Sequence, residues 1–77
     1  MNAQRRKSLE KVEALIAEAR SLLEEVVTEE KDAYDNMPES LQNSERGETM
    51  YDNLSQLEDM VANLEEAEDT LVNVRNA

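Results

Sequence analysis

Apolar residues recur at alternating steps of three and four along two long stretches of the chain. The two series are Leu9, Val12, Ile16, Ala19, Leu23, Val26 and then Met50, Leu54, Leu57, Val61, Leu64, Leu71. This spacing collects the apolar side chains on one stripe of an α-helix. Only one short polar stretch separates the two series, so the chain is expected to fold back on itself. The sequence therefore predicts an all-α fold, an antiparallel two-helix hairpin with coiled-coil-like packing, in a single domain over residues 1–77.

The first helix is expected over about residues 8–35. Ser8 is a suitable N-cap, and neither glycine nor proline interrupts the residues that follow it. Asp35 and Asn36 disfavour continuation of the helix. Pro38 reinforces this stop, because a proline disfavours the helical conformation of the residue before it.

The turn is expected over about residues 36–44, with a short helical turn at about 38–42, where a proline is well suited to the first position. The second helix then covers about residues 45–74. Either Asn43 or Ser44 can cap it, because both side chains can accept a hydrogen bond from the first backbone N–H groups of the helix.

The two stripes can be aligned around a turn centred near Ser40. Partner residues then have numbers that sum to 80, which sets Leu9 against Leu71 and Ala33 against Gly47. We expect the helices to approach closely at this last pair, because both side chains are small. Registers with sums of 73 or 87 also preserve the heptad pattern and stay open.

Two glutamates, Glu30 and Glu68, fall on the predicted seam. We expect both side chains to bend outward, Glu68 in the direction of Lys11. Polar residues at such positions commonly restrict the register or the number of helices in a bundle.

The chain holds more apolar residues than one seam between two helices can bury. Burying a leucine or valine is worth roughly 1.5–3 kcal/mol, so several exposed ones are unfavourable. A chain of 77 residues without cysteine has no disulfide to support a small core. We therefore expect a homo-oligomer, a dimer in which two hairpins dock into a four-helix bundle. The residues expected to form this contact are Leu15, Leu22, Val27, Met60 and Val72.

Most residue types that carry catalysis are missing. The chain contains no histidine, no cysteine and a single glycine, which removes the usual general base, thiolate ligands and phosphate-binding loops. Adjacent carboxylates such as Glu24-Glu25 and Glu65-Glu66 lack a partner that would shift their pKa, so we interpret them as solvated helix faces. We expect a protein that is not an enzyme, with no cofactor and no metal site.

The net charge is strongly negative, with 8 basic and 19 acidic residues giving −11. No basic residue lies between Arg46 and Arg75, whereas Asp52, Asp59 and Glu66 recur there every seven residues. Such a surface repels nucleic acid and anionic membranes, and it suits a basic protein partner. A row of carboxylates can also imitate a phosphate backbone. An alternative hypothesis is therefore an acidic inhibitor, of the anti-defence or DNA-mimic type, that blocks a basic nucleic-acid-binding surface.

The turn is the most distinctive part of the sequence. Turn chemistry alone accounts for its composition, but tyrosine and arginine are also enriched at binding hot spots. It could therefore form a recognition tip that presents Tyr34, Met37 and Arg46 to a partner, with Tyr51 close by.

The segment from Tyr34 to Gly47 reads Y-D-N-M-P-E-S-L-Q-N-S-E-R-G, and a Leu-Glu-Asp pattern follows between Leu54 and Leu64. These features, over roughly half of the chain, resemble a set of short, acidic, helical proteins found in bacterial and prophage genomes. The resemblance implies a helical hairpin and a phage or prophage setting, but no activity. No signal-peptide core or transmembrane run is evident, so we expect a cytoplasmic protein of a bacterial or phage-infected cell.

These observations together predict a non-enzymatic module for protein–protein interaction or assembly, such as a phage accessory protein. The acidic inhibitor is the alternative, and a structural spacer with no outside ligand is a third interpretation.

Overall fold

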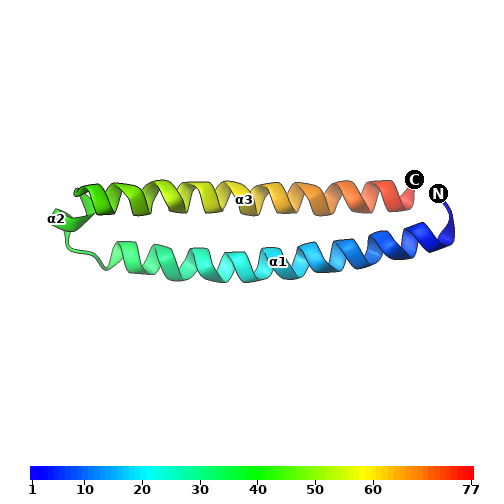
Figure 1. The fold of residues 1–77 in the computed structure, drawn as a ribbon, viewed down its shortest axis with the longest axis horizontal. Helices are drawn as coiled ribbons and strands as arrows, with labels where there is room; N and C mark the ends of the chain where they lie inside the picture. The colour runs from blue at the N-terminus through cyan, green and yellow to red at the C-terminus, as the bar shows by residue number, and fades with distance from the viewer.

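The computed structural model describes all 77 residues, and the chain is helical almost throughout. Helix α1 spans Ala3–Asp35, the short helix α2 spans Glu39–Gln42, and helix α3 spans Glu45–Asn76. α1 and α3 run antiparallel and side by side along most of their length, and α2 lies in the turn that joins them (Figure 1). The predicted all-α helical hairpin is therefore confirmed.

α1 begins at Ala3, earlier than the predicted start at Ser8. Asn2 caps it instead, because its side-chain oxygen accepts a hydrogen bond from the backbone N–H of Arg5 at 2.8 Å. Ser8 lies inside the helix, where its hydroxyl donates to the carbonyl oxygen of Gln4. The end of the helix agrees with the prediction, since Asp35 is its last residue.

α3 begins as predicted but ends slightly later, at Asn76. Ser44 is its N-cap, and the Ser44 hydroxyl oxygen accepts a hydrogen bond from the backbone N–H of Gly47 at 3.3 Å. Gly47 is buried because α2 packs on the first turns of α3. A Cβ atom at this position would overlap the backbone carbonyl oxygens of Leu41 and Gln42. The predicted close approach at Gly47 therefore involves α2 and not Ala33, which is exposed.

The molecule is a rod with a very small core. It measures 58 × 15 × 12 Å, and its radius of gyration of 17.3 Å exceeds the roughly 11–12 Å of a compact domain of this length. Leu54, with 7% of its surface exposed, is the only buried side chain. The remaining seam residues are half-buried, because each faces one neighbouring helix and solvent on both sides.

The seam of α3 is the predicted one, whereas the seam of α1 is rotated by one residue. Every predicted seam position of α3 from Met50 to Leu71 is buried or half-buried. On α1, Leu9, Ile16 and Leu23 are half-buried as predicted, but the other predicted apolar seam positions are exposed, which are Val12, Ala19, Val26 and Ala33. Their places on the seam are taken by residues one position later in sequence, which are Glu13, Arg20, Val27 and Tyr34.

The register also differs from the expected one. Contacting pairs such as Arg20 with Glu68 have numbers that sum to 88, and Tyr34 with Tyr51 gives 85, instead of 80. The pairing is therefore closer to the alternative register of 87. As a result the first turns of α3 extend past the end of α1, where the turn and α2 lie against them (Figure 1).

Candidate interaction surfaces

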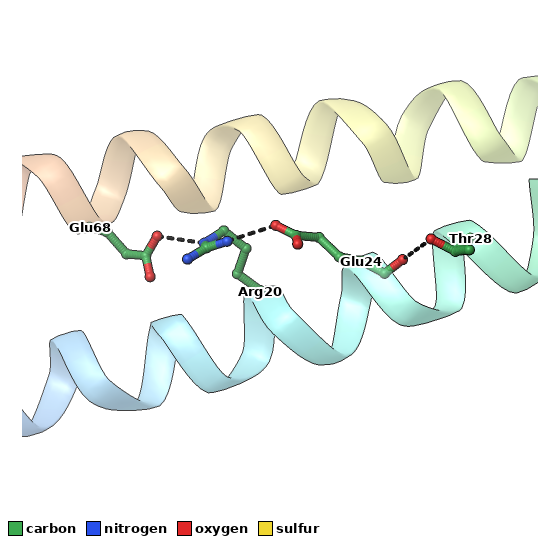
Figure 2. Close-up of polar contacts among 4 residues, drawn as sticks. All are labelled: Arg20, Glu24, Thr28 and Glu68. Carbon is green, nitrogen blue, oxygen red and sulfur yellow. Dashed lines mark hydrogen bonds and ion pairs between the residues drawn. The ribbon is translucent and has the colours of Figure 1, made fainter.

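Arg20 lies on the seam and joins the two long helices. Its Nε donates to Glu68 Oε2 on α3 at 2.6 Å, and its Nη1 donates to Glu24 Oε1 at 2.7 Å (Figure 2). The hydrogen bond to Glu68, followed by that to Glu24, raises the pKa of the Arg20 guanidinium above its usual value. The Glu68 side chain is only 16% exposed, and it points to Arg20 instead of outward to Lys11 as predicted.

A second ion pair repeats this arrangement one heptad away. Arg75 Nε of α3 donates to Glu13 Oε2 of α1 at 3.1 Å. The sequence contains the signal for both pairs, because a glutamate precedes an arginine by seven residues at Glu13 and Arg20 and again at Glu68 and Arg75. Only an antiparallel arrangement sets each glutamate against an arginine. A search for apolar stripes alone does not detect this pattern.

The two tyrosines meet at the turn end of the hairpin. Their ring centroids are 6.0 Å apart and their planes are inclined by 53°. Tyr34 is half-buried, and the Gln42 side-chain amide donates to its backbone carbonyl oxygen at 2.8 Å. Tyr51 is 61% exposed. A surface depression beside the rings, here named the tyrosine hollow, is lined by Tyr34, Gln42, Asn43, Glu48, Tyr51 and Asp52.

The other two residues of the predicted recognition tip lie outside the tyrosine hollow. Met37 is half-buried in the turn. Arg46 is exposed and lies two heptads before Met60, on the opposite side of α3 from Tyr51. The structure thus brings Tyr34 and Tyr51 together, but it does not join Met37 or Arg46 to them.

The acidic row of α3 is open to solvent. Asp52, Asp59 and Glu66 share one heptad position of α3, and all three are exposed. None of the ion pairs in the structure involves them. They therefore remain available to a basic partner.

A second apolar stripe, about a quarter turn from the seam, runs along the outside of α1. Its members are exposed, and Leu15 and Leu22 are the most open, at 65% and 62%. On α3, Met60 and Val74 are exposed at positions two heptads apart. We name this side the uncharged face, formed by Val12, Leu15, Ala19, Leu22, Val26 of α1 and Met60, Asn63, Ala67, Thr70, Val74 of α3.

A shallow groove shows that these two rows belong to the same side of the hairpin. Val12 of α1 and Ala67 and Leu71 of α3 all line it. Glu66 is the one charged residue among its lining side chains. The lining of this groove is therefore mostly uncharged.

The residues predicted for self-association divide between different sides. Leu15, Leu22 and Met60 lie on the uncharged face. Val27 does not, because the rotated seam of α1 turns it toward α3, where it is half-buried. Val72 is also half-buried, and it lies three heptads after Tyr51, on the opposite side of the hairpin.

No protein-family model, curated protein or solved structure matches this chain. No helix combines the length and the apolar character needed to cross a membrane. No three carboxylates converge closely enough to hold a metal ion. Three surfaces of the hairpin stand out by their own chemistry, namely the uncharged face, the acidic row and the tyrosine hollow.

Proposed function

We propose that this protein is a non-enzymatic module for protein interaction and assembly, in which two hairpins dock through their uncharged faces into a four-helix bundle. The observation that supports this most directly is the exposure of Leu15 and Leu22 on the uncharged face, whose groove has Glu66 as its one charged lining residue. Covering such side chains is worth roughly 1 kcal/mol or more each. In a dimer, each of the two copies contributes its own exposed leucine side chains to the contact.

The charge of the chain favours a second copy as the occupant of this face. Each copy carries a net charge of −11, so two copies repel one another wherever their carboxylates meet. The uncharged face avoids this repulsion. A basic partner would find only Glu66 to pair with in the groove of this face. The small core around Leu54 adds a further reason, because a fold with so little buried surface benefits from a partner that is always present.

Sedimentation equilibrium tests the dimer directly, since the proposal predicts twice the chain mass of 8.8 kDa at micromolar concentration. The double substitution Leu15→Gln, Leu22→Gln should shift the mass toward that of one chain. The matched control is Ala14→Gln, Ser21→Gln, which changes the exposed residue immediately before each leucine. A wild-type chain that is monomeric and fully helical under these conditions contradicts the proposal.

The biological setting that fits this module is that of a phage or bacterial accessory protein in the cytoplasm. The resemblance of the turn segment from Tyr34 to Gly47 to short acidic helical proteins of prophage genomes supports this setting. Capture from a bacterial host lysate, followed by mass spectrometry, would identify the partner. Failure to recover any partner would favour a structural spacer instead.

The acidic row favours a second candidate function, an inhibitor that occupies a basic nucleic-acid-binding surface. Asp52, Asp59 and Glu66 are exposed and without ion pairs, and residues one heptad apart on a helix are about 10.5 Å apart. This function predicts that partner binding weakens steeply with salt. Charge reversal of the row should abolish it, whereas charge reversal at Glu18 and Glu25, exposed acids of α1, should not.

A further inference from the structure

We propose that the tyrosine hollow binds a cationic side chain of a partner protein, specifically the guanidinium group of an arginine. This inference rests on the proposed interaction function and names the chemistry that the partner supplies. The hollow combines two aromatic rings with two carboxylates and contains no basic residue. An anionic or purely apolar ligand would not gain from this combination.

The aromatic part of the site is the pair of rings. Tyr51 is 61% exposed although it contacts Tyr34, so its ring is accessible to a ligand. A guanidinium ion is attracted to the face of a tyrosine ring and stacks on it through its own flat surface. The neighbouring ring of Tyr34, held where Gln42 closes the turn, provides a second aromatic wall.

The polar part of the site consists of hydrogen-bond acceptors. Glu48 and Asp52 lie one turn apart on α3, and neither forms an ion pair within the chain. The Gln42 amide nitrogen donates to the backbone of Tyr34, which leaves the Gln42 amide oxygen as an acceptor. A guanidinium group offers five N–H donors in a flat fork that matches carboxylates, whereas an ammonium group offers a single point of charge. The geometry thus favours arginine over lysine.

A second depression lies on the other side of the tyrosine pair and is a poorer site for a cation. Lys31 contributes to its lining together with Asp35 and Glu58, so a bound cation would meet a like charge. The tyrosine hollow also lies on the opposite side of the hairpin from Leu15, Leu22 and the uncharged face. Two docked hairpins would therefore leave both hollows open.

The two tyrosines are the only aromatic residues of the chain, so the aromatic proton resonances report on this site alone. The protein is titrated at low ionic strength with N-acetyl-arginine amide, with the lysine analogue, and with N-acetyl-citrulline amide, which has nearly the same shape but no charge. We expect arginine to shift both tyrosine ring systems, lysine to shift them less, and citrulline to leave them unchanged. Equal shifts with arginine and citrulline would overturn the proposal, as would no shift at all.

Two substitutions test the carboxylates. Glu48→Gln and Asp52→Asn should each weaken arginine binding about two- to fivefold, the range of an exposed ion pair. Asp59→Asn is the matched control, because Asp59 shares the heptad position of Asp52 but lies outside the hollow. If Asp59→Asn weakened arginine binding as much as Asp52→Asn, the effect would reflect only the net charge of the protein, and the proposed site would be overturned.

Sedimentation of the same samples separates this site from the proposed assembly. A stable dimer whose tyrosine resonances do not shift with arginine would overturn only the proposal for the tyrosine hollow. A monomer whose tyrosines respond to arginine but not to citrulline overturns the four-helix bundle alone.

Discussion

Gly47 gives a residue-scale test in which even the direction of the effect is informative. In an ordinary helix interior, replacing glycine by alanine stabilises the protein by roughly 0.5–1 kcal/mol. Here the new Cβ would meet the backbone carbonyl oxygens of Leu41 and Gln42, which cannot move without displacing α2. We therefore expect Gly47→Ala to lower the free energy of unfolding by about 1–3 kcal/mol, as overpacking does. Urea unfolding measures this, and an increase in stability would show that α2 does not pack on α3 in this way.

The contact between Arg20 and Glu68 is expected to act as a coupled pair. Arg20→Gln or Glu68→Gln alone leaves one charged group without its partner on the seam, so each should lower the melting temperature. The double substitution should lower it by less than the two single effects together. Glu24→Gln serves as the comparison, because Glu24 pairs with Arg20 within the same helix and is more exposed. Additive effects would show that the contact across the helices contributes nothing.

The pH dependence of this contact follows from the direction of the pKa shift. Glu68 and Glu24 raise the pKa of Arg20 in the folded chain. A raised pKa means that the stabilisation is fully present below the arginine pKa of the unfolded chain and is lost only above it. Mildly alkaline solution should therefore leave the contribution of Arg20 intact.

Local sequence signals narrow one helix cap to two candidates and miss another. The cap of α3 is expected at Asn43 or Ser44, and the structure has Ser44, which is followed by acidic residues suited to a first turn. Ser8 looked equally suitable, but Asn2 is also a good cap and the residues between them are good helix formers. Nothing in the local sequence forces the helix to begin at the later of two competing caps.

At the scale of the elements, α1 shows why its seam was predicted one residue away from its position. Leu9, Ile16 and Leu23 can be combined with the apolar series of Val12 or with the mixed series of Glu13. Counting apolar residues selects the first combination. The structure adopts the second, in which Glu13 and Arg20 meet Arg75 and Glu68 of α3 and Val27 and Tyr34 also lie on the seam. The sequence of α1 alone does not distinguish the two combinations, because the difference lies in which residues of α3 they meet.

The features of the fold that the sequence predicts are therefore those determined by local sequence, within each helix or within the turn. The heptad spacing indicated two helices, and Pro38 together with Asn36 marked the turn. The rotation of α1 and the register depend on contacts between segments. The tyrosine hollow depends on both, because it forms only where the register brings Tyr51 next to Tyr34.

Two adjacent valines test the rotated seam. Val27 is half-buried against α3, whereas Val26 is exposed on the uncharged face. Val27→Ala removes packing within the hairpin, so it should lower the melting temperature at every protein concentration. Val26→Ala should lower it mainly at high concentration, where the proposed dimer is populated. Thermal unfolding over a range of concentrations distinguishes them, and the reverse result would restore the seam predicted from apolarity.

At the scale of the whole molecule, the charge of −11 makes salt a useful variable. Two such chains repel, and added salt screens that repulsion, so the proposed dimer should become tighter as ionic strength rises. Sedimentation equilibrium at low and high ionic strength measures this change. Binding of arginine to the tyrosine hollow should respond in the opposite direction. A dimer that weakens with added salt would indicate that ion pairs, not uncharged faces, hold the copies together.

The N-terminus and the C-terminus of the chain lie together at the end of the rod opposite the turn. Arg6 Nη2 donates to the backbone carbonyl oxygen of Ala77 at 3.2 Å, and the ends are adjacent in Figure 1. Any sequence fused to either end would emerge there, at the other end of a rod 58 Å long from the tyrosines. Joining the ends by a short glycine linker and opening the chain between Gln42 and Ser44 would give a circular permutant. Such a permutant would keep both long helices while cutting the connection that holds Tyr34. It would therefore separate the formation of the helical hairpin from the formation of the tyrosine hollow.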